Sequence, residues 1–302
     1  MNQINRKALY LYLAIAFSLA WILFILPRLL AGSSNPASSG IHTLFWSLAM
    51  WAPGVAAILS NRYVLQQPIE MLGLRRLGPR HMLFYAWLIP PLLAIMTGII
   101  TWALGLGIFD SQLSQIQAAL QNAPGGVSTS PWLVVGVQIL FAITLAPLIN
   151  TIFALGEELG WRGFLLPQLL PLGQGKAILI SGIIWGIWHA PAILQGLNYP
   201  AQPYLGILFM VVFCVLLGTF LSWLYLRTKS PWVPALAHGS INATAGIALL
   251  FLKGVNITYS GTVASPVGWI SLGLLVIWLY RSKRLPVHEN QKPPENVSRE
   301  TI

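Results

Sequence analysis

The sequence predicts an all-α fold, a polytopic membrane protein with about eight transmembrane helices. Hydrophobic residues make up 56% of the 302-residue chain and charged residues only 8%, whereas a soluble domain carries about 25% charged residues. Apolar stretches long enough to cross a bilayer, about 20 residues each, also recur along the chain. A soluble helical protein would need a polar face on each stretch, and these have almost none. They lie at 8–31, 41–60, 81–106, 131–156, 177–195, 204–226, 231–252 and 261–280.

The basic residues predict the orientation of these spans. With a cytoplasmic N-terminus, every Lys and Arg except Arg28, Lys253 and Arg162 falls in a loop or tail on the cytoplasmic side. Positively charged loops stay in the cytoplasm, so we expect a multi-pass integral membrane protein with both termini cytoplasmic. The net charge of +10 is explained by this topology, and we expect no nucleic-acid partner.

The chain divides into four regions. Residues 1–130 hold three N-terminal spans and their loops, 131–250 form the core that carries the candidate chemistry, 251–285 hold the last span, and 286–302 form a polar cytoplasmic tail that we expect to be disordered. A short external helix is expected within 109–126. Cys214 is the only cysteine, so neither an internal disulfide nor a cysteine-based metal cluster is expected.

Few carboxylates and histidines are associated with the interior of the predicted spans. Glu157 and Glu158 are the only carboxylates associated with a span, and His189 and His238 are the histidines within spans. An ionisable group at bilayer depth costs roughly 2.5–3.5 kcal/mol on insertion scales, which favours a functional role.

The spacing separates the two glutamates. Glu158 and Arg162 lie four residues apart, so on a helix they share a face and can pair. Glu157 is rotated by about 100° from its neighbour and is left free for chemistry. Taken alone, the Glu158–Arg162 pair is more often structural.

The histidines have helical partners of their own. His238 and Asn242 are four apart among small residues, which allow close helix packing. Trp185 precedes His189 by one turn, and Pro191 is expected to weaken the helix there. Each histidine alone is compatible with an inter-helix hydrogen bond. Together the glutamate, the histidines and the asparagine form a typical hydrolytic set.

The three motifs, E-E-x-x-x-R (Glu157, Glu158, Arg162), aromatic-x-x-x-H (Trp185, His189) and H-x-x-x-N (His238, Asn242), resemble those of a known family. This is the CAAX prenyl protease and bacteriocin-processing (CPBP, Abi-type) family of intramembrane proteases. The resemblance covers about 131–250. In one departure, the second motif usually begins with phenylalanine, and here it begins with Trp185, which affects the shape of the pocket.

The resemblance implies a role for each residue. Glu157 and His189 would activate a water, His238 and Asn242 would stabilise the oxyanion, and Glu158 and Arg162 would hold the helix of the first glutamate. A carboxylate and a histidine can act as a general base, and a histidine and an amide can donate to an oxyanion.

Metal dependence stays open, because Glu157, His189 and His238 also make the one-carboxylate, two-histidine ligand set of a catalytic zinc ion. We favour the metal-independent glutamate mechanism, since it gives Asn242 a role and leaves the base free.

The short loops indicate that the substrate is itself a membrane-bound or lipidated peptide or protein. Eukaryotic members of the family cut prenylated C-terminal tails. Bacterial members are associated with peptide maturation, bacteriocin immunity or surface-protein handling, and nothing in this sequence favours one of these substrates. The alternative is a non-enzymatic membrane protein, either a peptide-binding scaffold or a proton-coupled transporter. A transporter more often shows paired repeats and broken helices in both halves.

Overall fold

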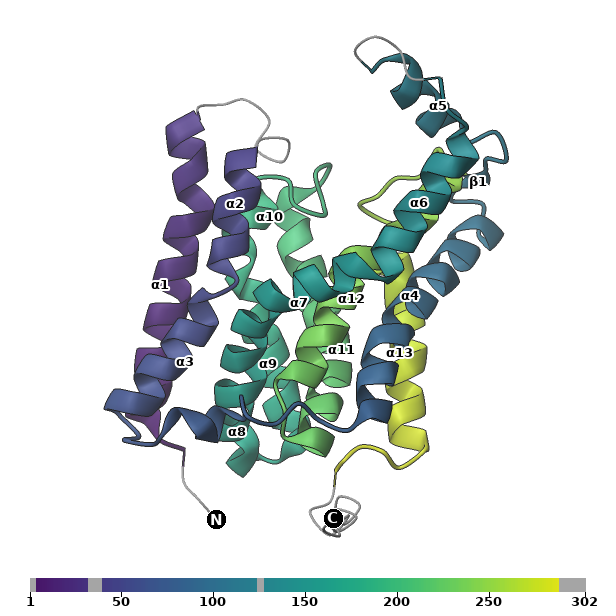
Figure 1. Ribbon diagram of the computed structural model, residues 1–302. Coiled ribbons are helices and arrows are strands. Elements are labelled where there is room, and N and C mark those ends of the chain that lie inside the picture. The colour runs from purple at the N-terminus through teal and green to yellow at the C-terminus, as the bar shows by residue number, and fades with distance from the viewer. Residues whose placement is uncertain (1–3, 32–39, 124–127, 288–302) are drawn as a thin grey trace, which may run out of the picture.

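The computed structural model describes residues 4–31, 40–123 and 128–287, and within them the predicted all-α fold is confirmed (Figure 1). The strands of the described residues are β1 (Ile108–Phe109) and β2 (Leu252–Lys253), which pair antiparallel with Ile108 opposite Lys253. The sheet ties the segment after the third predicted span to the segment before the last one.

The N-terminal helices pack as one group. The helix α1 (Arg6–Ala31) lies against α2 (Gly40–Ala49) and α3 (Ala52–Tyr63), which form one span with a break at Met50 and Trp51. Pro53 lies in the first turn of α3, where the missing N–H of proline does no harm. A 3₁₀ turn, η2 (Ile69–Leu72), and the helix α4 (Arg80–Ala103) follow.

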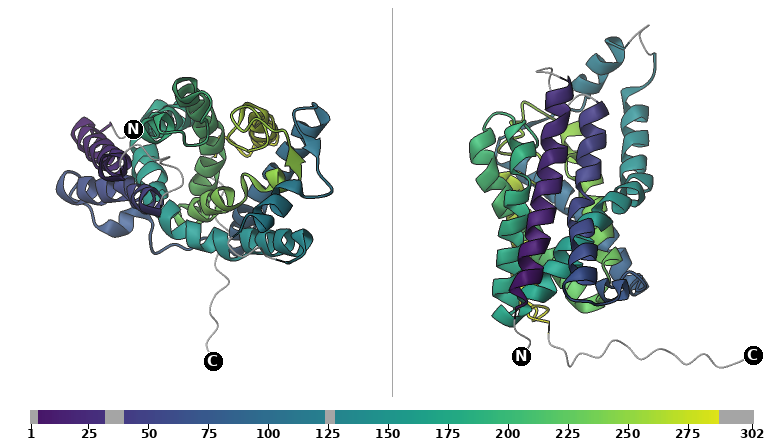
Figure 2. Two further views of the ribbon diagram at one scale, coloured as in Figure 1. Left: turned by 90° about the horizontal axis from the view of Figure 1, so that it is seen from above. Right: turned by 90° about the vertical axis from the view of Figure 1, so that its left-hand side faces the viewer.

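The remaining helices build the core of the bundle (Figure 2). The helix α12 (Trp232–Thr244) packs mainly on α7 (Leu145–Glu158) and α4, while α11 (Pro203–Thr228) packs on α9 (Gln174–Trp188). The start of α1 and the end of α13 lie at the same end of the bundle (Figure 1). These elements are α5 (Ser114–Gln121), α6 (Pro131–Ile143), α7 (Leu145–Glu158), η3 (Leu159–Leu165), α8 (Leu166–Leu169), η4 (Leu170–Leu172), α9 (Gln174–Trp188), α10 (Ala190–Leu194), α11 (Pro203–Thr228), α12 (Trp232–Thr244), η5 (Ile247–Leu250) and α13 (Pro266–Arg281).

Every predicted apolar stretch forms helix, but the count of eight spans stays a prediction. Among the described residues, 5 helices are long and apolar enough to cross a membrane, and the bent pair Pro131–Ile143 and Leu145–Leu172 makes a sixth. The stretches 177–195 and 261–280 form α9 and α13, of 15 and 16 residues. Both are shorter than the roughly 20 residues that a perpendicular crossing needs.

Two smaller expectations concern the chain outside the spans. The short helix predicted within 109–126 is present as α5, and Asp110 precedes it and accepts the Ser114 backbone N–H through Oδ2 at 2.7 Å. The tail predicted to be disordered is 286–302. Its first two residues are described by the structure, and residues 288–302 lie outside the described residues.

Candidate active site

The two glutamates lie where α7 changes into a π-helix. The α-helix ends at Glu158 and continues as η3, whose residues are all buried. π-Helical turns are rare and frequently occur at functional sites. Gly156 lets this segment approach the α2–α3 break closely, because a Cβ on it would lie 2.7 Å from the Met50 carbonyl oxygen. The candidate chemistry is therefore placed on a tightly packed, irregular turn.

Glu158 is the centre of a buried charged group. Its Oε1 accepts hydrogen bonds from the Arg162 guanidinium and from the His238 Nδ1, both at 2.9 Å. Glu158, Arg162 and His238 are 0%, 1% and 4% exposed. The expected Glu158–Arg162 ion pair is thus present. The bond to His238 was not predicted, since 80 residues separate the two and no local pattern joins them.

Glu157 faces different partners. Its Oε2 accepts the indole N–H of Trp185 at 2.6 Å and that of Trp161 at 3.2 Å. The side chain is 2% exposed, and no ion pair involves it within the described part of the chain. Buried carboxylates are normally paired with a cation. Glu157 instead has two neutral donors on one oxygen, and Oε1 takes no part in these bonds.

His189 lies at the break between α9 and α10, as expected from Pro191. Its Nδ1 is 2.9 Å from the Trp185 carbonyl oxygen. A carbonyl only accepts, so Nδ1 carries the proton and the neutral ring keeps a lone pair on Nε2. Trp185 therefore holds both Glu157, through its indole N–H, and His189, through its carbonyl oxygen.

Trp185 connects all these groups. Its ring lies under the Arg162 guanidinium at 4.5 Å and meets the His238 ring edge-on at a centroid distance of 5.3 Å. Its N–H bonds to Glu157 and its carbonyl to His189. The sequence placed Trp185 in the pocket, but its role as a hydrogen-bond donor was not anticipated.

The motif residues of the site differ in how far they are exposed. Asn242 is exposed on α12, one turn beyond His238, and His189 is half-buried. The charged group around Glu158 is fully enclosed. Of the motif residues, only Asn242 and His189 are therefore not buried.

Two aromatic residues at the site were missed. Trp161 donates to Glu157, and its spacing of four from Glu157 could have indicated this bond. Tyr12 comes from α1, stacks on Phe164 at 4.9 Å and meets Trp161 edge-on at 5.9 Å. Its buried hydroxyl has no hydrogen-bond partner among the described residues. Nothing in the sequence links Tyr12 to the motifs.

Glu157, His189 and His238 are also the candidate ligands of a zinc ion. Within the part of the chain that the structure describes, no group of three or more His, Cys, Asp or Glu side chains is placed to hold a metal ion. Glu157, His189 and His238 lie in one region, but they do not converge as a ligand set. In this arrangement the residues do not fit the zinc site.

Comparison with known proteins points to the same segment. Residues 129–244 match the family model described as type II CAAX prenyl endopeptidase Rce1-like. This segment of the chain is therefore similar to the type II CAAX prenyl endopeptidases. A protein of Methanococcus maripaludis described as CAAX prenyl protease 2 is 26% identical over 240 residues, which cover 77% of this chain and 82% of that protein.

The matched segment contains every motif residue, from Glu157 to Asn242. It also agrees with the extent of the resemblance drawn from the motifs. The similarity to CAAX prenyl endopeptidases supports an endopeptidase acting in the membrane.

Proposed function

We propose that the chain hydrolyses a peptide bond of a lipid-modified, membrane-bound peptide or protein, with water activated by Glu157 and His189. The observation that carries the proposal is that Trp185 holds both the buried carboxylate of Glu157, which forms no ion pair among the described residues, and His189, whose neutral ring has its lone pair on Nε2. A carboxylate and a histidine beside each other can take a proton from water.

In the proposed hydrolysis, bonds and protons change in the following order. The water oxygen bonds to the peptide carbonyl carbon, and the water gives one proton to Glu157 or His189. Negative charge then develops on the carbonyl oxygen. When the C–N bond breaks, the stored proton passes to the departing amine, and the two products are a carboxylic acid and an amine.

His238 and Asn242 are proposed to stabilise the developing negative charge. Glu158 holds His238 through Nδ1, so Nε2 is the atom left for a substrate. The Asn242 side chain is exposed one turn further along the same helix. Donors fixed in a water-poor site stabilise an oxyanion more strongly than water does.

Zinc is the alternative way to activate the water. A bound zinc ion would lower the pKa of its water, with Glu157, His189 and His238 as the proposed ligands. Because these side chains do not form a ligand set here, we favour activation by the protein's own groups. The zinc content of the purified protein should therefore be measured together with its cleavage activity.

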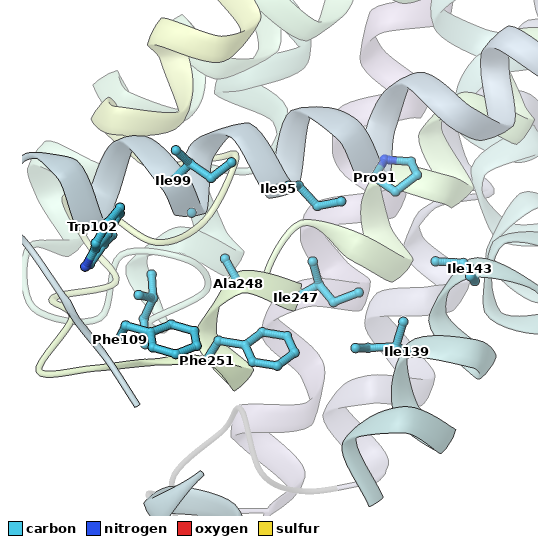
Figure 3. Close-up of a pocket in the computed structure, with 12 residues that line it drawn as sticks. Pro91, Ile95, Ile99, Trp102, Phe109, Ile139, Ile143, Ile247, Ala248 and Phe251 are labelled. Carbon is cyan, nitrogen blue, oxygen red and sulfur yellow. The ribbon is translucent and has the colours of Figure 1, made fainter. Parts of the chain in front are cut away.

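An apolar cavity supports a lipid-modified substrate. It has a volume of about 420 Å³ and lies between α4, α6 and η5 (Figure 3). The helix α12 carries His238 and Asn242 and leads into η5, whose Ile247 and Ala248 line the cavity. Its lining residues are apolar, which suits a hydrocarbon chain. Since the related proteins are described as prenyl proteases, we propose that the lipid chain of the substrate binds here.

A cleavage assay with paired substrates tests both parts of the proposal. Protein purified in detergent is given a membrane peptide library, with and without a prenyl group on each peptide, and products are identified by mass spectrometry. Wild type should cleave, Glu157→Ala should not, and a zinc chelator should leave the rate unchanged. Ile95→Trp, which narrows the cavity from α4, should raise KM for prenylated peptides only.

Other results would favour the alternatives. Binding of peptides without cleavage, equal in wild type and Glu157→Ala, would indicate a scaffold. Proton-coupled uptake into vesicles would indicate a transporter. Loss of cleavage with the chelator, restored by zinc, would indicate a metalloprotease.

A further inference from the structure

We infer that the indole N–H of Trp185 positions the catalytic carboxylate of Glu157, a role that the family's usual phenylalanine at this place cannot perform. The inference rests on the proposed function of Glu157. It assigns the departure from the family motif a specific task in this chain.

The hydrogen bond itself is the first argument. The distance from Trp185 Nε1 to Glu157 Oε2 is 2.6 Å, whereas the second indole, from Trp161, is 3.2 Å from the same oxygen. Hydrogen bonds to an ionised acceptor are short and roughly twice as strong as neutral ones. Trp185 is therefore the principal donor to the carboxylate.

The rigidity of the indole is the second argument. Trp185 is 1% exposed, with Arg162 over its ring face and the His238 ring against it. Its helix is held close to α11, because a Cβ on Gly182 would lie 2.7 Å from the Val215 Cα. A donor fixed in this way can set the orientation of a flexible carboxylate.

The hydrogen bonds of Trp185 determine which atoms of Glu157 and His189 remain free to act on a water. Trp185 holds Oε2 and leaves Oε1 to face a water. The same residue's carbonyl holds Nδ1 of His189, so one residue sets the places of both the carboxylate and the histidine. Catalysis needs reacting groups in near-attack geometry, and a misplacement of about 1 Å can cost on the order of 10²-fold in rate.

Trp185→Phe removes the N–H and keeps an aromatic ring in the pocket. We expect kcat to fall roughly 10- to 100-fold with little change in KM. The matched control is Trp223→Phe on α11, a buried indole whose N–H has no hydrogen-bond partner among the described residues. The control should keep wild-type kcat and KM.

A double variant separates positioning from general support of the fold. In a Glu157→Gln background, Trp185→Phe should cause no further loss of the residual rate, because groups that act as a unit are not additive. A full further loss in that background, or an unchanged kcat in the single variant, would overturn the inference.

A second readout does not depend on cleavage. In ¹⁵N-tryptophan-labelled protein, the indole resonance that disappears in Trp185→Phe identifies Trp185. In Glu157→Ala its proton should shift upfield, as expected when a short hydrogen bond is lost, while the Trp223 resonance stays in place. If the Trp185 resonance does not move, the inference is wrong even if the protein is a protease. If it moves but wild type cleaves nothing, the bond is real, its catalytic role is wrong, and the proposed function fails.

Discussion

Glu157 and Glu158 are adjacent in the chain, but their side chains have different surroundings. Glu158 is neutralised by Arg162 and also holds His238, whereas Glu157 has only indole donors. The rotation of about 100° between neighbours on a helix explains the separation. The sequence could predict this division, because it depends on spacing along one helix.

The division predicts different defects in two variants. Glu157→Gln should reduce cleavage by at least 10²-fold and leave the yield of folded protein unchanged. Glu158→Gln should mainly lower the yield, because removing one partner of a buried ion pair costs about 3–5 kcal/mol. Size-exclusion chromatography and a cleavage assay on the same preparations measure both effects. Equal yields with equal losses of activity would contradict the division.

Asn242 and His238 predict a specific kinetic pattern. If Asn242 donates to the oxyanion, Asn242→Ala should lower kcat about 10²- to 10³-fold with KM nearly unchanged. Such a bond strengthens only as charge develops in the transition state.

A metal-ligand role for His238 predicts another pattern. His238→Ala would then lose bound zinc together with all activity, and Asn242→Ala would show a milder defect. Zinc analysis of wild type and His238→Ala, beside kinetics of both variants, distinguishes the two mechanisms. Full turnover by Asn242→Ala would remove its oxyanion role.

At the scale of elements, glycines control how closely the helices approach the site. A Cβ on Gly239 of α12 would lie 2.6 Å from the Thr151 backbone nitrogen of α7, which is the close packing expected from the small residues around His238. The bond between His238 and Glu158 depends on this approach. The sequence indicated that small residues gather there, but the partner helix could not be read from a local pattern.

Gly156 tests the importance of this packing. Gly156→Ala should destabilise the protein by roughly 1–3 kcal/mol, because its Cβ would lie 2.7 Å from both the Met50 carbonyl oxygen and the Trp51 Cα. Gly136→Ala on α6 is the matched control, since no atom lies within 4 Å of its Cβ. The control should be neutral or stabilising by about 0.5–1 kcal/mol. Thermal unfolding in detergent compares the two, and an equal Tm for both variants would contradict this packing.

At the scale of the whole molecule, the apolar stretches identified the helices because hydrophobicity is a local property of the sequence. Their lengths were less predictable. Pro191 ends α9 at Trp188, and the chain at 261–265 precedes α13 without joining it. The contacts of Tyr12 and the bond between Glu158 and His238 also required the folded chain, because they join distant segments.

The orientation in the membrane is a further prediction. Because nearly all loop and tail basic residues fall on one side of the predicted spans, both termini should be cytoplasmic. Reporter fusions at residues 35, 120 and 200 should then report an external position. A cytoplasmic signal from the fusion at residue 120 would contradict the eight-span topology.

The central claim is that water, activated at Glu157, cleaves a peptide bond inside the membrane. The most direct measurement is cleavage of a prenylated membrane peptide in H₂¹⁸O, followed by mass spectrometry of the new C-terminus. We predict one ¹⁸O atom in the new carboxylate with wild-type protein, and at least 10²-fold slower product formation with Glu157→Gln. Product formed at the wild-type rate by Glu157→Gln, or no product from either protein, would contradict the claim.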